Sequence, residues 1–358
     1  MLPFATMSQA KNTIPMLVGS YTDNDSQGIS LYNFNTQTGE ATHVKTFPAS
    51  NPSFVVATKN KAFFYAVNEN GDGKGAVSAF TKEGKLINQQ PSHGDHPCHV
   101  NIDKTQNWVV VSNYSGGNFS IYKREANGAL SVALQTIQHN GKGTNTQRQE
   151  KAHVHSTTFN AENNMLFVVD LGTDQIVAYN FDEKTGHVTQ NDKASIQTAP
   201  GHGPRILQFY KNFAYIIEEM SGTVSVYAFN QQTTSFKHIQ TISSLPKDYT
   251  IQNNDAGSAH IHITQDGKNV YATNRSTSNT IATFKRNSST GQLTLLNTLP
   301  VEGKGPRHFT LTPNEKFLLV ANQNTNNITL FQRTPQTGQL KATKKTINTP
   351  KPVCLTWF

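Results

Sequence analysis

Short apolar segments recur along the whole chain, and in most of them apolar and polar residues alternate, as in residues 327–331 (Asn-Ile-Thr-Leu-Phe). Such alternation is typical of half-buried β-strands, in which successive side chains point to opposite faces of a sheet. No stretch has the 3.6-residue repeat of an amphipathic helix. The pattern therefore predicts an all-β protein.

A longer repeat groups these strands into units of four. Each unit has a short strand after Pro or Ala, an apolar strand that ends in Asn, Asp or Glu, and an alternating third strand. A Thr-Gly or Asn-Gly turn usually precedes the fourth strand. The unit anchors are 45 to 55 residues apart and are Pro52, Pro97, Ala152, Pro204, Ala259, Pro306 and Pro352. This spacing is typical of the blades of a β-propeller.

The two ends of the chain complete the count of blades. Only one strand, residues 353–358, fits after Pro352, whereas the amino end opens with three strands that lack a first one, at residues 16–21, 28–34 and 41–47. Pairing of the C-terminal strand with these three makes a seventh blade, which closes the ring and removes exposed sheet edges. The sequence predicts one domain over residues 16–358, a seven-bladed β-propeller of four-stranded blades, after an N-terminal tail at residues 1–15.

Composition limits the classes of partner. No segment approaches the roughly 20 apolar residues of a membrane-spanning helix, so we expect a soluble protein. The Lys residues are scattered and form no basic stripe, which argues against a nucleic-acid partner. The net charge of +8 is only a weak indication of anionic ligands. The sequence has no glycine-rich phosphate loop between a strand and a helix, so we expect no nucleotide cofactor. The first 15 residues have no secretory pattern, so we expect a cytoplasmic protein, or a periplasmic one if a leader is missing from this sequence.

Polar residues are concentrated at the start of the first strand and the end of the second strand of the predicted blades. In a blade, the start of strand one and the end of strand two lie on the same face of the ring, and unusual groups stand at both places. At the starts of first strands are His99, His153, His155, Arg205, His260, His262, Arg307 and His308, and at the ends of second strands are Glu69, Tyr114, Asp170, Glu218, Glu219, Asn274, Arg275 and Asn322. Two long connections, residues 140–151 and 245–258, are expected to open onto the same face as rims or lids.

Three of these groups carry a prediction about chemistry. Arg205, Arg275 and Arg307 hold equivalent positions in the ring, and one neighbouring glutamate cannot neutralise three guanidinium groups. Such an excess favours a planar or tetrahedral anion held by paired hydrogen bonds. The alternative interpretation is a polar, water-filled channel in which His and Asn side chains merely bind water.

With these residues in view, the chain resembles the seven-bladed propeller lactonases, the family of the bacterial propeller-type 6-phosphogluconolactonase, which is related to the fungal carboxymuconate-lactonizing enzyme. The resemblance covers residues 16–358 and rests on the order and spacing of many short motifs. These are Gly19-Ser20-Tyr21-Thr22, Asn51-Pro52-Ser53, His96-Pro97-Cys98-His99-Val100, Asn113-Tyr114-Ser115-Gly116-Gly117, Ala152-His153-Val154-His155, Gly203-Pro204-Arg205, Glu219-Met220-Ser221-Gly222-Thr223, Ala259-His260-Ile261-His262, Asn274-Arg275 and Gly305-Pro306-Arg307-His308.

The resemblance implies a site made of His153 or His155, Arg205, Glu219 and Arg275. Strand alternation puts the two histidines on the same side, so the choice between them stays open, as does the choice between Glu218 and Glu219. The implied reaction is the opening of 6-phosphogluconolactone by water to 6-phosphogluconate.

The roles expected for that reaction follow the chemistry of ester hydrolysis. His155, with His153 as substitute, is expected to be the base, and Glu219 to orient it or share its proton. Arg205 and Arg275 are expected to stabilise the oxyanion or to hold the lactone. The remaining candidates are expected to bind substrate, with the phosphate on the first two: Arg307, His308, His99, His260, His262 and Asn274.

Three other functions compete with hydrolysis. A lactonizing cycloisomerase would use the same anion-binding arginines. A metal-dependent hydrolase is suggested by His153-x-His155 and His260-x-His262, but no carboxylate set completes a metal shell and the nearby arginines repel cations, so we expect no metal and no cofactor. A non-catalytic binding propeller is the third, because a fold alone proves no activity. The expected partner is a small anionic sugar lactone, and the expected state is a monomer.

Overall fold

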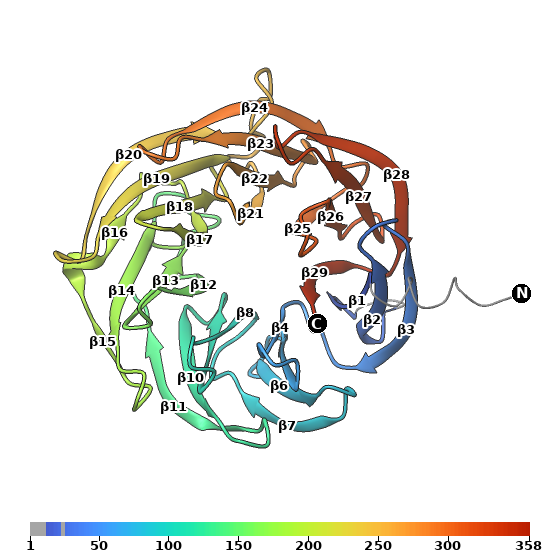
Figure 1. Ribbon diagram of the computed structural model, residues 1–358. Helices are drawn as coiled ribbons and strands as arrows, with labels where there is room; N and C mark the ends of the chain where they lie inside the picture. The colour runs from blue at the N-terminus through green and yellow to red at the C-terminus, as the bar shows by residue number, and fades with distance from the viewer. Residues whose placement is uncertain (1–11, 23–25) are drawn as a thin grey trace, which may run out of the picture.

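The computed structural model describes residues 12–22 and 26–358, which form seven antiparallel sheets around one axis (Figure 1). Six blades are continuous in sequence. The first three are β4 (Val55–Ala57), β5 (Phe63–Asn68), β6 (Ala76–Thr81), β7 (Leu86–Pro91); β8 (Pro97–Ile102), β9 (Trp108–Asn113), β10 (Asn118–Arg124), β11 (Leu130–Gln138); and β12 (Val154–Phe159), β13 (Met165–Asp170), β14 (Gln175–Phe181), β15 (Val188–Gln190), with β16 (Ile196–Gln197) also paired to β14.

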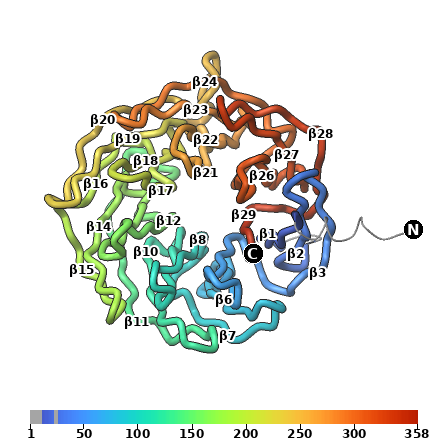
Figure 2. Tube along the Cα trace, viewed as in Figure 1, coloured from blue at the N-terminus to red at the C-terminus, as the bar shows by residue number. Residues whose placement is uncertain are grey.

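The other three continuous blades are β17 (Pro204–Tyr210), β18 (Phe213–Glu218), β19 (Thr223–Asn230), β20 (Ser235–Ser243); β21 (Ser258–Ile263), β22 (Asn269–Asn274), β23 (Thr280–Arg286), β24 (Leu293–Pro300); and β25 (Pro306–Leu311), β26 (Phe317–Asn322), β27 (Asn327–Arg333), β28 (Leu340–Asn348). A 3₁₀ turn, η1 (Asp192–Ala194), precedes β16. The first strand of each blade lies nearest the ring axis (Figure 2).

The seventh blade joins the two ends of the chain, as the sequence predicts. It consists of β29 (Pro352–Trp357), β1 (Thr13–Ser20), β2 (Gly28–Asn35) and β3 (Ala41–Pro48), in that order. Leu17 pairs with Thr356 across the closing contact, and the two colours of the termini meet there in Figure 1. β1 begins at Thr13 rather than at Met16, and residues 1–11 of the expected tail lie outside the described residues.

Apolar faces of neighbouring blades pack together and form the core. One cluster joins Val110 and Phe119 of one blade to Val154 and Leu166 of the next. A tyrosine hydroxyl then fixes each of three blade pairs by donating to a glycine carbonyl in the turn before the next blade's fourth strand. These bonds are Tyr65 to Gly128 (2.9 Å), Tyr215 to Gly291 (2.8 Å) and Tyr271 to Gly338 (2.6 Å). The rigid ring therefore holds its inner strands at fixed relative positions.

An irregularity repeats in the innermost strands. Pairing of strand one with strand two shifts by a residue in five blades, at Pro97/His99, Val154/Ser156, Pro204/Ile206, Ser258/Ile261 and Pro306/His308. A β-bulge of this kind leaves one residue outside the regular alternation and redirects its side chain. The bulged residues include His155, Arg205 and Arg307, so the same local device places three of the predicted site residues.

Candidate active site

Glu219 is the centre of a cluster of guanidinium groups at one mouth of the ring. Its Oε2 accepts from Arg205 Nε at 2.7 Å and lies 2.9 Å from Arg275 Nη2, while its Oε1 accepts from Arg148 Nη2 at 2.6 Å. Arg148 Nη1 also pairs with Asp255. Three guanidinium groups thus face two carboxylates.

The fold brings these groups together from five places in the sequence. Glu219 and Arg275 directly follow the second strands β18 and β22, and Arg205 occupies the bulge of β17. Backbone carbonyls fix two of the arginines: Arg205 Nη1 donates to Ala259 O, and Arg275 Nε donates to Gly257 O at 3.0 Å. The convergence of Arg205, Arg275 and Glu219 agrees with the arrangement that the sequence predicts.

The cluster is buried and strongly charged. Burial by itself raises the pKa of Glu219, but Arg275, Arg205 and Arg148 outweigh it and hold that pKa well below 4.5. Burial, together with the neighbouring Arg275, lowers the pKa of Arg205 to about 9. Glu219 is therefore ionised and Arg205 protonated at neutral pH, so the carboxylate serves to hold the guanidinium groups in place.

His153 and His155 have different surroundings although they are close in sequence. His153 lies just before β12, stacks on Tyr114 with 4.5 Å between ring centroids, and bonds through Nδ1 to Tyr114 O (3.1 Å) and through Nε2 to Glu150 (3.1 Å). His155 lies in the bulge of β12, where its buried Nδ1 has no hydrogen-bond partner among the described residues. Both ring nitrogens of His153 are thus engaged, whereas Nδ1 of His155 is buried and unpartnered.

The electrostatic setting keeps His155 neutral. Burial is the main cause, and Arg205 adds to it, so the pKa of His155 lies well below 6.5; Glu219 opposes the shift only in part. A neutral imidazole beside guanidinium groups can accept a proton during a reaction. Of the two histidines that the sequence leaves open, the structure favours His155.

Arg307 belongs to a second, smaller group beside the cluster. Its Nη2 lies 3.5 Å from Glu69 Oε2, its guanidinium lies over the Tyr21 ring at 5.4 Å, and Tyr21 donates to Glu69 Oε1 at 2.9 Å. Burial alone would lower the pKa of Arg307, but the facing Tyr21 and Glu69 raise it. Arg307 is therefore a fixed positive charge with its own carboxylate partner.

Other predicted histidines lie farther along the channel. The ring centroids of His260 and His308 are 4.0 Å apart, and those of Phe54 and His99 are 4.5 Å apart. Burial lowers the pKa of His99 and His308 to about 3, and that of His260 to well below 6.5. His99 and His260 line a cavity of about 460 Å³ that also includes residues of the turns after strand one, on the opposite face from the cluster.

His262, two residues beyond His260 on β21, is half-buried and lies near Phe309, with 6.4 Å between ring centroids. Burial lowers its pKa to about 4. His262 thus belongs to this deeper group of imidazoles, and the structure does not bring it to Glu219.

Two carboxyl or amide candidates turn into their own blades. Glu218 accepts from His202 Nδ1 at 2.8 Å and from Ser225 Oγ at 2.9 Å, which settles the inward carboxylate as Glu219. Asn274 is fully buried and bonds Ser258 and Ser244 of its own and the preceding blade. The structure therefore does not bring Asn274 to the cluster, because its side-chain amide is bonded to Ser244 and Ser258 instead.

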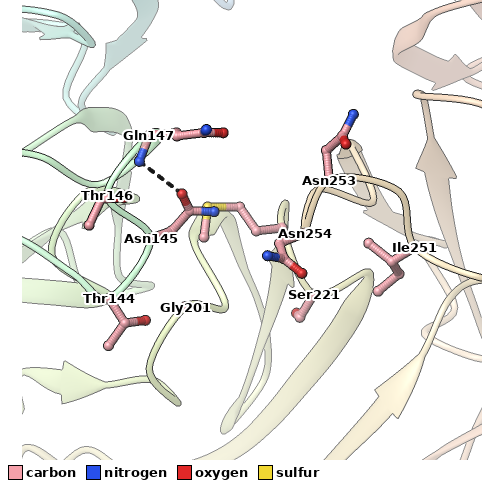
Figure 3. A pocket seen from close by; sticks show the side chains of 10 residues that line it. Thr144, Asn145, Thr146, Gln147, Gly201, Ser221, Ile251, Asn253 and Asn254 are labelled. Atoms are coloured by element: carbon pink, nitrogen blue, oxygen red, sulfur yellow. Dashed lines mark hydrogen bonds between the residues drawn. The ribbon is translucent and has the colours of Figure 1, made fainter.

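A cavity of about 680 Å³ lies beside the cluster on the same face. Residues 144–147 of the β11–β12 loop and Ile251, Asn253 and Asn254 of the β20–β21 loop face each other across it (Figure 3). Met220 and Ser221 also line it. Most of its side chains carry hydroxyl or amide groups: Thr144, Asn145, Thr146, Gln147, Ser221, Asn253 and Asn254. The two long connections thus form the rim that the sequence predicts.

Arg148 and Asp255 are the site residues that sequence reasoning missed. Each is one of several charged residues in one of the two long loops, and no motif surrounds it. The only signal was the length of the loops. Within residues 12–22 and 26–358, no three His, Cys, Asp or Glu side chains are grouped to hold a metal ion, and no helix is long and apolar enough to cross a membrane.

Comparison with known proteins places this site in a family. The model of the lactonase family described as a 7-bladed β-propeller matches residues 15–357. The chain belongs to this seven-bladed propeller lactonase family. Among lactonase relatives, the 6-phosphogluconolactonase of Bacillus subtilis is 36% identical over 346 residues, which cover 94% of this chain and 96% of the relative.

Solved structures agree with this assignment. A crystal structure of a Bacteroides fragilis protein matches with a TM-score of 0.91 and 35% identity, and each chain is covered completely. The periplasmic gluconolactonase of Pseudomonas aeruginosa matches with a TM-score of 0.90 and 30% identity, over 96% of this chain and 99% of that one. The predicted seven-bladed lactonase propeller is confirmed.

Proposed function

We propose that this chain hydrolyses 6-phosphogluconolactone to 6-phosphogluconate at the cluster around Glu219. One observation carries the proposal: a neutral, buried imidazole with an unpartnered nitrogen, His155, lies within electrostatic reach of Arg205 and Glu219 in a propeller lactonase. Lactone opening needs a proton acceptor for water and positive charge at the carbonyl oxygen. The cluster supplies both.

In the proposed reaction, water adds to the lactone carbonyl while His155 accepts its proton. The oxygen of the carbonyl becomes an oxyanion, and the ring C–O bond then breaks as the proton passes to the leaving alkoxide. Arg205 commits Nε and Nη1 to Glu219 and Ala259, which makes Nη2 its remaining donor toward the oxyanion. Arg275 supports the same charge from the neighbouring blade.

Glu219 has a different role from the one expected from the sequence. A carboxylate whose pKa is held well below 4.5 by three guanidinium groups does not share a proton near neutral pH. We assign it to positioning, because it holds Arg205 and Arg275 about one shared oxygen. Preorganised charge of this kind costs no rearrangement during the reaction.

A substrate panel tests the proposal. Purified protein is assayed with 6-phosphogluconolactone, glucono-δ-lactone and a carboxymuconate, each against its spontaneous rate and with and without a chelator. We expect enzymatic opening of the phosphorylated lactone that the chelator does not affect, because the arginine cluster repels cations. Turnover of the muconate alone would instead make the protein a lactonizing cycloisomerase, and turnover of none would leave a binding propeller.

The proposal extends to location and partners. A phosphate monoester does not cross a membrane unaided, so a phosphorylated substrate is in keeping with the cytoplasm, in contrast to the periplasmic Pseudomonas relative. We propose a monomer that acts on a small anionic lactone and needs neither nucleic acid nor a membrane. Cell fractionation tests the location, and light scattering tests the monomeric state.

A further inference from the structure

Two loops meet across the mouth of the site through one arginine. Arg148, on the loop between β11 and β12, binds Glu219 at 2.6 Å and pairs with Asp255 on the loop between β20 and β21. It also donates to the Tyr114 hydroxyl at 3.3 Å. Its side chain is 29% exposed, against 20% for Arg275 and 4% for Arg205. Arg148 is thus the guanidinium that an incoming ligand meets first.

Arg148 is held in a way that permits exchange of its partners. All its described partners at the site are side chains, whereas Arg205 and Arg275 are also fixed by backbone carbonyls. When Arg148 turns to another anion, Glu219 still has Arg205 and Arg275. Asp255 retains the backbone N–H of Gly257 at 2.8 Å. Neither carboxylate is then left buried without a partner, which is the costly outcome.

The charge and the lining of the mouth define the ligand. Three guanidinium groups against two carboxylates leave one positive charge in excess, and the planar fork of arginine matches a phosphate with two parallel hydrogen bonds. The adjoining cavity of about 680 Å³ has no charged side chain among its described lining residues. Its hydroxyl and amide groups, which Figure 3 shows on both loops, suit the hydroxyls of a sugar chain.

We propose that Arg148 binds the phosphate of the substrate. The phosphate then replaces the carboxylate of Asp255 as a partner of the Arg148 guanidinium group. This inference rests on the proposed function. It moves the phosphate from Arg307 and His308, where the sequence places it, to the rim. Arg307 is already paired with Glu69 and stacked over the Tyr21 ring, and His308 is neutral and buried. The lactone carbonyl then points inward to Arg205 and His155. Arg148 is a specificity-determining residue that favours phosphorylated lactones.

The experiment compares kcat/KM for 6-phosphogluconolactone and glucono-δ-lactone in the wild type, Arg148→Gln, Arg148→Lys and Lys142→Gln. Lys142 is an exposed cation of the same loop and serves as the matched control. We expect the phosphorylated-to-unphosphorylated ratio to fall about 10- to 100-fold in Arg148→Gln, since a charged hydrogen-bonding group is lost. The ratio is expected to fall less in Arg148→Lys and to stay unchanged in Lys142→Gln.

A second measurement serves if Arg148→Gln does not fold. Inorganic phosphate is used as a competitive inhibitor of the wild type and of Asp255→Asn, and it is expected to inhibit the variant about threefold or more tightly because Asp255 no longer competes for Arg148. An unchanged lactone ratio in folded Arg148→Gln, or phosphate inhibition unaffected by Asp255→Asn, would overturn the inference alone. A wild type that opens neither lactone would overturn the proposed function instead.

Discussion

The buried imidazoles of the channel make the protein sensitive to acid. His99, His155, His260 and His308 are each at most 9% exposed, and burial lowers all four pKa values, to about 3 for His99 and His308. In the unfolded chain the same groups titrate near 6.5. Below that pH the unfolded state therefore binds more protons than the folded state, so the free energy of unfolding falls as pH falls from about 6.5 toward 3.

The size of this effect follows from proton linkage. Between about pH 7.5 and about pH 5.5, one imidazole that stays neutral in the folded state lowers the free energy of unfolding by about 1.4 kcal/mol. Four such groups give about 5 kcal/mol. That loss is a large part of the roughly 5–15 kcal/mol that stabilises an ordinary domain.

Urea unfolding at the two pH values, followed by tryptophan fluorescence, measures the loss. The decisive comparison is His99→Gln, whose amide can still accept the backbone N–H of Thr157, against the exposed His238→Gln. We expect the difference between the two pH values to shrink by about 1.4 kcal/mol in His99→Gln and to stay unchanged in His238→Gln. A wild-type difference that persists in full in His99→Gln would show that His99 is not held neutral in the folded protein.

Three further predictions concern the cluster and the thiols. Glu219→Gln leaves buried guanidinium groups without their shared carboxylate and should lower the free energy of unfolding by about 3–5 kcal/mol in urea titrations; an unchanged midpoint would contradict the geometry. Arg205→Gln removes a charge that lowers the pKa of His155, so the acid limb of the pH–rate profile for the residual activity should move to higher pH, and a move to lower pH would refute the role of His155. Burial raises the pKa of Cys98 to about 12 and of Cys354 to about 11, so both thiols should resist alkylation near pH 8 until urea unfolds the chain, as mass spectrometry would show.

Much of the fold follows from sequence because it repeats. Strand alternation, the recurring Pro or Ala anchors and the incomplete units at the two ends predict seven blades and their closure. Ring geometry then predicts that Arg205, Arg275 and Glu219 converge, since residues at equivalent places in different blades face one axis. Periodic information of this kind needs no knowledge of individual contacts.

What escaped prediction depends on departures from that regularity. The bulge at His155 breaks the alternation on which the comparison with His153 relied, and nothing in the local sequence marks a bulge. Arg148 and Asp255 lie in loops whose paths are set by tertiary contacts rather than by a period. Asn274 stands at the expected place, but its amide bonds the preceding loop, and a sequence does not show which way a side chain turns.

The proposed mechanism depends on His155, near the guanidinium cluster, accepting the proton of the attacking water. The most direct test is the kcat for 6-phosphogluconolactone of His155→Asn beside that of His153→Asn, with the spontaneous rate subtracted. We expect a loss of about 10²–10⁴-fold for His155→Asn and a clearly smaller loss for His153→Asn. A His155→Asn variant that is folded and turns over the lactone at the wild-type rate would contradict it.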